Sequence, residues 1–187
     1  MLQESKCTRW WKTTDKMGKK EKRIISLVSG VLLIILYITI FLFSEQDGET
    51  SGIVSFSLTK YGAGLWNKLT GGHLTQAMLE EMAVYFEHPL RKAAHFMEYA
   101  VMGILVYNVL YCRVAVRRKY LSAVLWVLLS AAADEWHQYF IPGRWASVAD
   151  VMLDTAGGMT GAFLAAWGLR HAVKVRNRKE KNINKDA

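Results

Sequence analysis

The chain has 187 residues, of which 52% are hydrophobic and 21% charged, and its formal net charge is +8. This length suits one domain or one small membrane bundle and excludes two sizeable enzyme domains. With only two prolines and 12% aromatic residues, the composition also excludes a disordered linker protein.

The first predicted element is a membrane-spanning helix. Residues 24–43 are twenty consecutive uncharged and mostly apolar residues. At about 1.5 Å of rise per residue they extend about 30 Å, the thickness of one hydrocarbon core. Because no small-x-small cleavage site follows, we expect a retained span rather than a cleaved signal peptide. The chain is therefore predicted to be a membrane protein.

The segment 44–92 is predicted to lie outside the membrane. Its first part contains the strings YGAG and TGG and is expected to be irregular. From about Thr75 to Glu87 the apolar residues recur with a helical period, which predicts a helix with one apolar side. That side consists of Leu74, Met78, Met82, Tyr85 and Phe86. We interpret it as a packing surface.

Three further apolar segments have the length of a span and contain no interior proline. They are residues 93–112, 120–140 and 148–168. They are less hydrophobic than the first span because each contains ionisable residues near one end. The sequence therefore predicts an all-α fold, a polytopic membrane bundle of four transmembrane helices within residues 24–168.

The charges between the predicted spans give the orientation. Eight Lys/Arg against three acids give residues 1–23 a charge of +5, and the loop 113–119 carries +4. Residues 170–187 carry +5, whereas residues 44–90 carry −4. By the positive-inside rule both termini are cytoplasmic, and 169–187 is the C-terminal tail. Because the bases lie at membrane-proximal ends rather than on one face, nucleic acid is not expected as a partner.

The ionisable residues of the predicted spans gather at the outer ends of the helices. Glu98, Asp134 and Asp154 each lie five or six residues inside a span, roughly 8–9 Å below its outer edge. A charge at that depth costs several kcal/mol unless it faces protein or water. We therefore predict that these three carboxylates line one outward-open cavity with Arg91 and Arg144.

Helical spacing extends this predicted polar pocket. Arg91, His95 and Glu98 lie at i, i+4 and i+7, on one stripe of a helix. Asp150 also fits a capping pattern with Ser147, three residues earlier. The residues taken from spacing and depth are Arg91, Lys92, His95, Glu98, Asp134, Glu135, His137, Gln138, Arg144, Asp150 and Asp154.

Several roles suit such a pocket. Arg91, Lys92 and Arg144 could clamp a phosphate or pyrophosphate headgroup. Glu98 or an aspartate could act as a base, with His95 as acid or proton relay. The alternative is that these residues form ion pairs that hold the bundle together. We expect no metal, since H-x-x-x-H and H-E-x-x-H are missing, and no cofactor, since no nucleotide-binding motif is present.

Small residues in the last span predict close helix packing. Gly157 and Gly161 form a G-x-x-x-G pair, and Gly158 lies beside them. Glycines at this spacing let two helix backbones approach closely in lipid.

Four blocks of the sequence resemble the conserved blocks of a known protein family. FSEQ follows the first span, RKAAHFMEY opens the second, DEWHQYFIPGR ends the third and DVMLDTAGGMTG lies in the fourth. Together they resemble the VanZ-like family over roughly residues 25–168. Asp154 departs from the pattern, because members of the family often carry Asn there. The family's characteristic positions correspond to Ser44, Gln46, Arg91, Lys92, His95, Glu98, Tyr99, Asp134, Glu135, Gln138, Arg144, Asp150 and Gly157 or Gly158.

The resemblance implies a multi-pass plasma-membrane protein of the bacterial cell envelope. The family is named for a protein linked to glycopeptide resistance, in particular to teicoplanin. Our leading hypothesis is an outer-leaflet pocket that binds a lipid headgroup or a lipid-linked cell-wall intermediate. The alternatives are a membrane enzyme acting on a phosphate- or glycosyl-lipid and a small transporter. No inverted repeat or broken helix favours transport.

Overall fold

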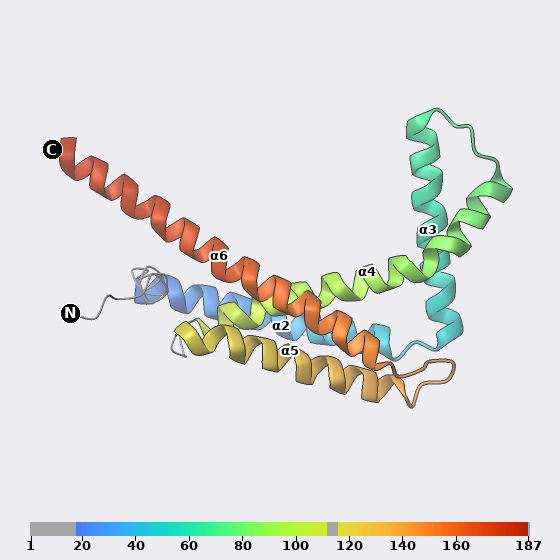
Figure 1. The fold of residues 1–187 in the computed structure, drawn as a ribbon, viewed down its shortest axis with the longest axis horizontal. Helices are drawn as coiled ribbons and strands as arrows, with labels where there is room; N and C mark the ends of the chain where they lie inside the picture. Colours follow the sequence, from blue (N-terminus) through green and yellow to red (C-terminus); the bar gives the residue numbers. More distant parts are fainter. Residues whose placement is uncertain (1–17, 112–115, 187) are drawn as a thin grey trace, which may run out of the picture.

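The computed structural model describes residues 18–111 and 116–186 (Figure 1). Within these ranges the chain forms five α-helices and no strand, which confirms the predicted all-α fold. Most of the N-terminal tail and part of the 113–119 loop lie outside the described residues. The helices are α2 (Lys19–Ser44), α3 (Gly48–Thr70), α4 (Gln76–Leu110), α5 (Val116–Gln138) and α6 (Val148–Asp186).

Two of these helices are long and apolar enough to cross a membrane. The mean hydropathy of the most apolar stretch is 2.7 in α2 and 1.3 in α4. Only 17% of that stretch of α2 is buried, and Leu27 and Leu42 are 71% and 61% exposed. An apolar surface of this extent favours a lipid environment. Among the described helices, α5 and α6 do not reach this hydropathy, so the number of four spans stays a prediction.

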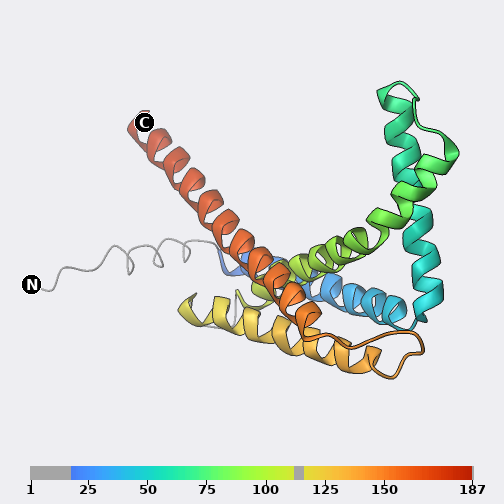
Figure 2. The same cartoon turned by 45° about the vertical axis from the view of Figure 1, so that its right-hand side comes forward.

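Four helices pack side by side as a bundle. α4 packs against α6 and α2, and α6 also packs against α5 (Figures 1 and 2). The bundle core is built around large side chains of α4, since Tyr99, Met102 and Tyr107 are at most 1% exposed. Val127 of α5 and Ala162 of α6 complete this core and are fully buried.

Glycines set the distance between α6 and its neighbours. Gly157 and Gly161 face the backbone carbonyls of Phe96 and Ala100 in α4 so closely that an added Cβ would collide with them. Gly158 faces a side chain of α5 in the same way. Backbones that approach this closely gain van der Waals contact along the whole interface. The three glycines therefore fix the position of the helix that carries Asp150 and Asp154.

The segment 44–92 is more helical than its sequence suggested. The irregular backbone expected in its first part is a 23-residue helix, α3. At its start the Asp47 side chain accepts a hydrogen bond from the Thr50 N–H at 2.6 Å, and at its end Gly71 has a φ of 112°. These caps satisfy backbone groups at both ends and outweigh the weak helix propensity of the internal glycines. The expectation of irregular structure was wrong.

α4 is longer than predicted. It joins the helix expected at 75–87 to the span expected at 93–112 in one run of 35 residues, with Pro89 inside it. A proline removes one backbone hydrogen bond and commonly bends a helix. The first half of α4 lies beside α3 and leaves the bundle with it, whereas the second half runs within the bundle (Figures 1 and 2).

The apolar side of the first half of α4 does not pack as predicted. Met78, Tyr85 and Phe86 are 46%, 74% and 47% exposed. The buried positions are Leu79 and Ala83, in the half of α4 that runs beside α3 (Figure 2). Leu74 and Met82 are partly buried, so three of the five residues of this apolar side are exposed.

The C-terminal tail continues the last predicted span. α6 runs without a break to Asp186, so most of 169–187 belongs to the same helix as 148–168. Beyond the predicted span, Arg176 Nη1 lies 3.0 Å from Glu21 Oε2 near the start of α2. This ion pair links the two chain ends that the charge pattern places in the cytoplasm.

Candidate functional site

The loop between α5 and α6 is attached to the junction of α2 and α3. The N–H of Gly48 donates to the carbonyl of Pro142 at 3.1 Å, and Arg144 Nη2 donates to the carbonyl of Phe43 at 2.9 Å. Gly143 has a φ of 74°, and a Cβ on Gly48 would collide with its carbonyl. Glycine is therefore required on both sides of this contact, which holds Arg144 at the end of α2.

A cavity of about 440 Å³ lies beside this loop, between α4, α5 and α6. We call it the polar cavity. Its wall also includes Gly48, the first residue of α3, and Trp145 and Ser147 from the loop before α6. Eight residues of the predicted pocket line it, namely Arg91, Lys92, His95, Glu135, Gln138, Arg144, Asp150 and Asp154.

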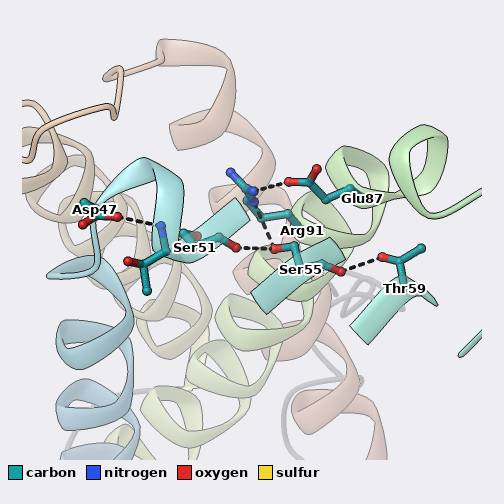
Figure 3. Close-up of polar contacts among 7 residues, drawn as sticks. Asp47, Ser51, Ser55, Thr59, Glu87 and Arg91 are labelled. Atoms are coloured by element: carbon teal, nitrogen blue, oxygen red, sulfur yellow. Dashed lines mark hydrogen bonds and ion pairs between the residues drawn. The ribbon is translucent and has the colours of Figure 1, made fainter. Parts of the chain in front are cut away.

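Two cations of the polar cavity form ion pairs. Lys92 Nζ lies 2.5 Å from Asp150 Oδ1, which joins α4 to α6. Arg91 Nη2 lies 2.5 Å from Glu87 Oε1, one turn earlier on α4. Arg91 Nε also donates to Ser55 Oγ of α3 at 3.3 Å (Figure 3). These contacts hold helices together, as the ion-pair alternative expects.

Arg144 differs from these two cations. Among the described residues, no carboxylate forms an ion pair with it, and its hydrogen bond is to the carbonyl of Phe43. Partial burial lowers the pKa of Arg144, and the nearby charge of Arg91 lowers it further. The guanidinium therefore keeps N–H donors that no ion pair occupies, although the charges of Asp134, Glu135 and Asp47 act on it from beyond ion-pair distance.

Two buried polar atoms on the polar cavity have no hydrogen-bond partner within the described protein. Asp154 is 2% exposed, and its Oδ1 accepts no bond. His95 Nδ1 is also unpartnered, since Glu98 Oε2 lies 3.6 Å away, beyond hydrogen-bond reach. Buried polar groups normally find partners. These two atoms therefore keep an unused hydrogen-bonding capacity within the described protein.

Glu135 has a structural contact instead. Its Oε2 accepts a hydrogen bond from the N–H of Ser147 at 2.8 Å, across the loop that precedes α6. Ser147 in turn caps α6, because its Oγ accepts from the N–H of Asp150 at 3.4 Å. Together these bonds position the first turn of α6, which carries Asp150 into the polar cavity.

Four residues of the predicted pocket do not line the polar cavity. Asp134 accepts hydrogen bonds from Ser44 Oγ at 2.5 Å, from Gln138 Nε2 at 3.1 Å and from Tyr99 OH at 3.4 Å. This network joins α2, α4 and α5 in the bundle interior. The four residues are Glu98, Tyr99, Asp134 and His137.

The prediction that Glu98, Asp134 and Asp154 line one cavity was wrong. Asp154 lines the polar cavity, whereas Asp134 lines an apolar cavity beside α2 and α5. Glu98 lines a third space of about 200 Å³ between α3 and α4, which we call the α3–α4 groove. Equal depth in a membrane does not fix the direction in which a side chain leaves its helix.

The remaining predicted positions lie around these spaces. His137 Nε2 is 3.0 Å from Glu45 Oε1, on the side of the bundle where α2 meets α5. Gln46 lines the α3–α4 groove. Among the described residues, no group of three His, Cys, Asp or Glu side chains is arranged to hold a metal ion.

Sequence reasoning missed several contacts of the site. Glu87 lies four residues before Arg91 on one helix, a spacing that indicates an ion pair. Ser55 carried no such signal, because it is one of several serines and threonines on a helix that was not predicted. Gly48 was also missed, although it lies only two residues after the FSEQ block.

The chain was compared with known proteins and protein families. The model of the family described as VanZ/LLP1 matches residues 30–169. No curated protein and no solved structure matched the chain. The matched range includes every residue that lines the polar cavity and the α3–α4 groove.

Proposed function

The chain belongs to the VanZ/LLP1 family, and on that premise we propose that it is a multi-pass protein of the bacterial plasma membrane whose polar cavity binds an anionic headgroup. The headgroup belongs to a lipid or to a lipid-linked cell-wall intermediate. An effect on glycopeptide susceptibility, in particular to teicoplanin, would be a consequence of that binding. Membership of the family agrees with the resemblance found in the sequence.

The main support for the proposal is that Arg144 forms no ion pair within the described residues. It lines the polar cavity without a carboxylate partner among the described residues, beside Lys92 and Arg91. A guanidinium offers a planar pair of donors that matches two phosphate oxygens. Because Arg144 is partly buried, such a contact is stronger there than at an open surface.

The proposed membrane arrangement places the polar cavity at the outer leaflet. α2 and α4 are apolar enough to span, and we propose that α5 and α6 complete four spans. The cavity lies where α2 ends and the acidic segment 44–92 begins, at the opposite end from the basic tail of α6. By the positive-inside rule, the acidic end is outside and both termini are cytoplasmic.

Native mass spectrometry of the detergent-purified protein checks this proposal. We expect a retained phosphate-containing lipid on the wild-type protein and its loss from Arg144→Gln. Arg178→Gln is the matched control, since Arg178 is exposed on the distant part of α6. Membrane abundance is measured in parallel. Equal lipid retention by Arg144→Gln and the control, at equal abundance, would contradict the proposal.

A second candidate function is supported by the unpartnered atoms of His95 and Asp154. A carboxyl group and an imidazole on one cavity can move a proton to or from a bound ligand. The protein would then be a membrane enzyme acting on a phosphate- or glycosyl-lipid. Asp154→Asn would bind the retained lipid but fail to convert it, and mass analysis of that lipid over time distinguishes an enzyme from a binding protein.

A further inference from the structure

We propose that the polar cavity and the α3–α4 groove bind two parts of one amphipathic ligand, a phosphate headgroup with a hydrogen-bond donor in the cavity and its hydrocarbon chain in the groove. This rests on the proposed headgroup binding and specifies its ligand class. A soluble phosphate or nucleotide would occupy the cavity alone.

The first observation is that the two spaces share a wall. Arg91, His95 and Arg144 line both the polar cavity and the α3–α4 groove. A molecule bound at this wall can therefore extend to either side of it. A phosphate held by Arg144 would have the polar cavity on one side and the groove on the other.

The second observation is the difference in chemistry between the two spaces. The α3–α4 groove has an apolar part, formed by Phe43, Val54, Leu58, Leu90 and Ala94, beside polar residues that include Gln46 and Glu98. Leu58 and Val54 are 60% and 47% exposed, so the groove is open along α3. Exposed apolar side chains on a helix beside a membrane gain free energy when a hydrocarbon chain covers them. The groove therefore suits the chain, and the charged cavity suits the headgroup.

The third observation concerns the headgroup. Asp154 lines the cavity and is almost fully buried, and its Oδ1 is an acceptor with no partner in the described protein. A phosphodiester has no donor of its own for such an oxygen, and its negative charge is repelled by an ionised carboxylate. A headgroup with a hydroxyl or ammonium group beyond the phosphate supplies the missing hydrogen bond. Arg144 and Asp154 thus select opposite ends of one headgroup.

The experiment measures binding of three probes to the full-length protein in a neutral maltoside detergent. Lysophosphatidylglycerol carries a chain, a phosphate and hydroxyls. Glycerophosphoglycerol lacks the chain, and hexadecyl methyl phosphate lacks the hydroxyls at the same single charge. We expect lysophosphatidylglycerol to bind at least about tenfold more tightly than either of the others. Replacing glycerol by ethanolamine in the first probe distinguishes a hydroxyl from an ammonium donor.

Variants then assign each part of the ligand. Leu58→Trp fills the α3–α4 groove and should remove the advantage of the chain while leaving glycerophosphoglycerol binding unchanged. Leu65→Trp is the matched control, because Leu65 lies on the same helix, is 48% exposed and does not line the groove. If Leu58→Trp proves unstable, Ala94→Phe in the groove and Ala93→Phe outside it give the same comparison.

The outcomes separate this inference from the proposed function. If Leu58→Trp and Leu65→Trp bind lysophosphatidylglycerol equally tightly, or if the wild-type protein does not prefer it to glycerophosphoglycerol, the groove does not hold the chain. If hexadecyl methyl phosphate binds as tightly as lysophosphatidylglycerol, the donor requirement at Asp154 is overturned. If no phosphate probe binds the wild-type protein, the proposed headgroup function itself fails.

Discussion

Ser44 Oγ donates a hydrogen bond of 2.5 Å to Asp134 Oδ1, although the two residues are 90 positions apart in the sequence. Ser44 is the last residue of α2, and Asp134 lies near the end of α5. Because Tyr99 and Gln138 donate to the same carboxylate, one acceptor connects three helices below the polar cavity. The network therefore fixes the end of α2, to which Arg144 is hydrogen-bonded.

Removing the Ser44 hydroxyl should destabilise this end of the bundle. Ser44 is 3% exposed, so Ser44→Ala leaves Asp134 one donor short in a buried position. We expect a loss of about 1–3 kcal/mol, measured as a lower thermal unfolding temperature in detergent. Ser57→Ala is the control, because Ser57 is exposed on α3. An equal effect of both substitutions would show that the network does not stabilise the fold.

Gly161 should tolerate no side chain, whereas Gly168 should tolerate one. A Cβ at Gly161 would collide with the carbonyl of Ala100, but at Gly168 it would meet nothing within 4 Å. Gly161→Ala should therefore separate α4 from α6 at a cost of about 1–3 kcal/mol. Gly168→Ala should be neutral or slightly stabilising, since alanine favours a helix. Unfolding temperatures of the two purified variants give the comparison.

The topology can be measured with enzyme fusions. Alkaline phosphatase is active only when it is exported from the cytoplasm. Fusions at residues 60, 117 and 180 should be active only at 60, because residues 113–119 and 170–187 carry charges of +4 and +5. Activity at residue 117 would overturn the four-span arrangement.

Headgroup binding should depend more on the shape of the Arg144 side chain than on its charge. Arg144→Lys keeps the charge but loses the planar pair of donors. We expect it to weaken headgroup binding, and any effect on glycopeptide susceptibility, by about tenfold at unchanged membrane abundance. A proportional fall in abundance and function would instead assign Arg144 to the stability of the loop.

The start of α3 should depend on pH through Asp47. The hydrogen bond from the Thr50 N–H holds the pKa of Asp47 below its ordinary value of 3.8. The charged cap therefore stabilises α3 above pH 3.8, and this contribution is lost as the pH falls through the lowered pKa of the folded state. Hydrogen exchange at Thr50 and Ser51 should accelerate in Asp47→Ala at neutral pH. The difference between the variant and the wild-type protein should shrink as the pH falls through the lowered pKa of the folded state.

Part of this structure could be predicted from the sequence. The helix α2 was recognisable because twenty consecutive apolar residues without a charge are typical of a helix long enough to cross a membrane. The residues of the polar cavity that come from α4 and α6, such as Lys92 and Asp150, were identified because charges at the same end of two spans need partners. In the structure Lys92 and Asp150 are each other's partners, because they form an ion pair.

Other features could not be predicted because they depend on three-dimensional context. α3 contains glycines that lower its helix propensity, and its stability comes from its caps and from packing against α4. The separate environments of Glu98 and Asp134 depend on how α4 and α5 rotate about their axes. Sequence spacing gives relative directions along one helix but no relative rotation between two.

The position of Pro89 has a mechanical consequence. α4 runs unbroken from the α3–α4 hairpin into the bundle, and Pro89 has no N–H to donate to the preceding turn. Arg91, at the wall shared by the polar cavity and the α3–α4 groove, lies two residues beyond this weakest point of the helix. A bend at Pro89 would change the angle between the two halves of α4. The first half of α4 and the helix α3 beside it would then pivot at a point next to the residues that are proposed to hold a headgroup.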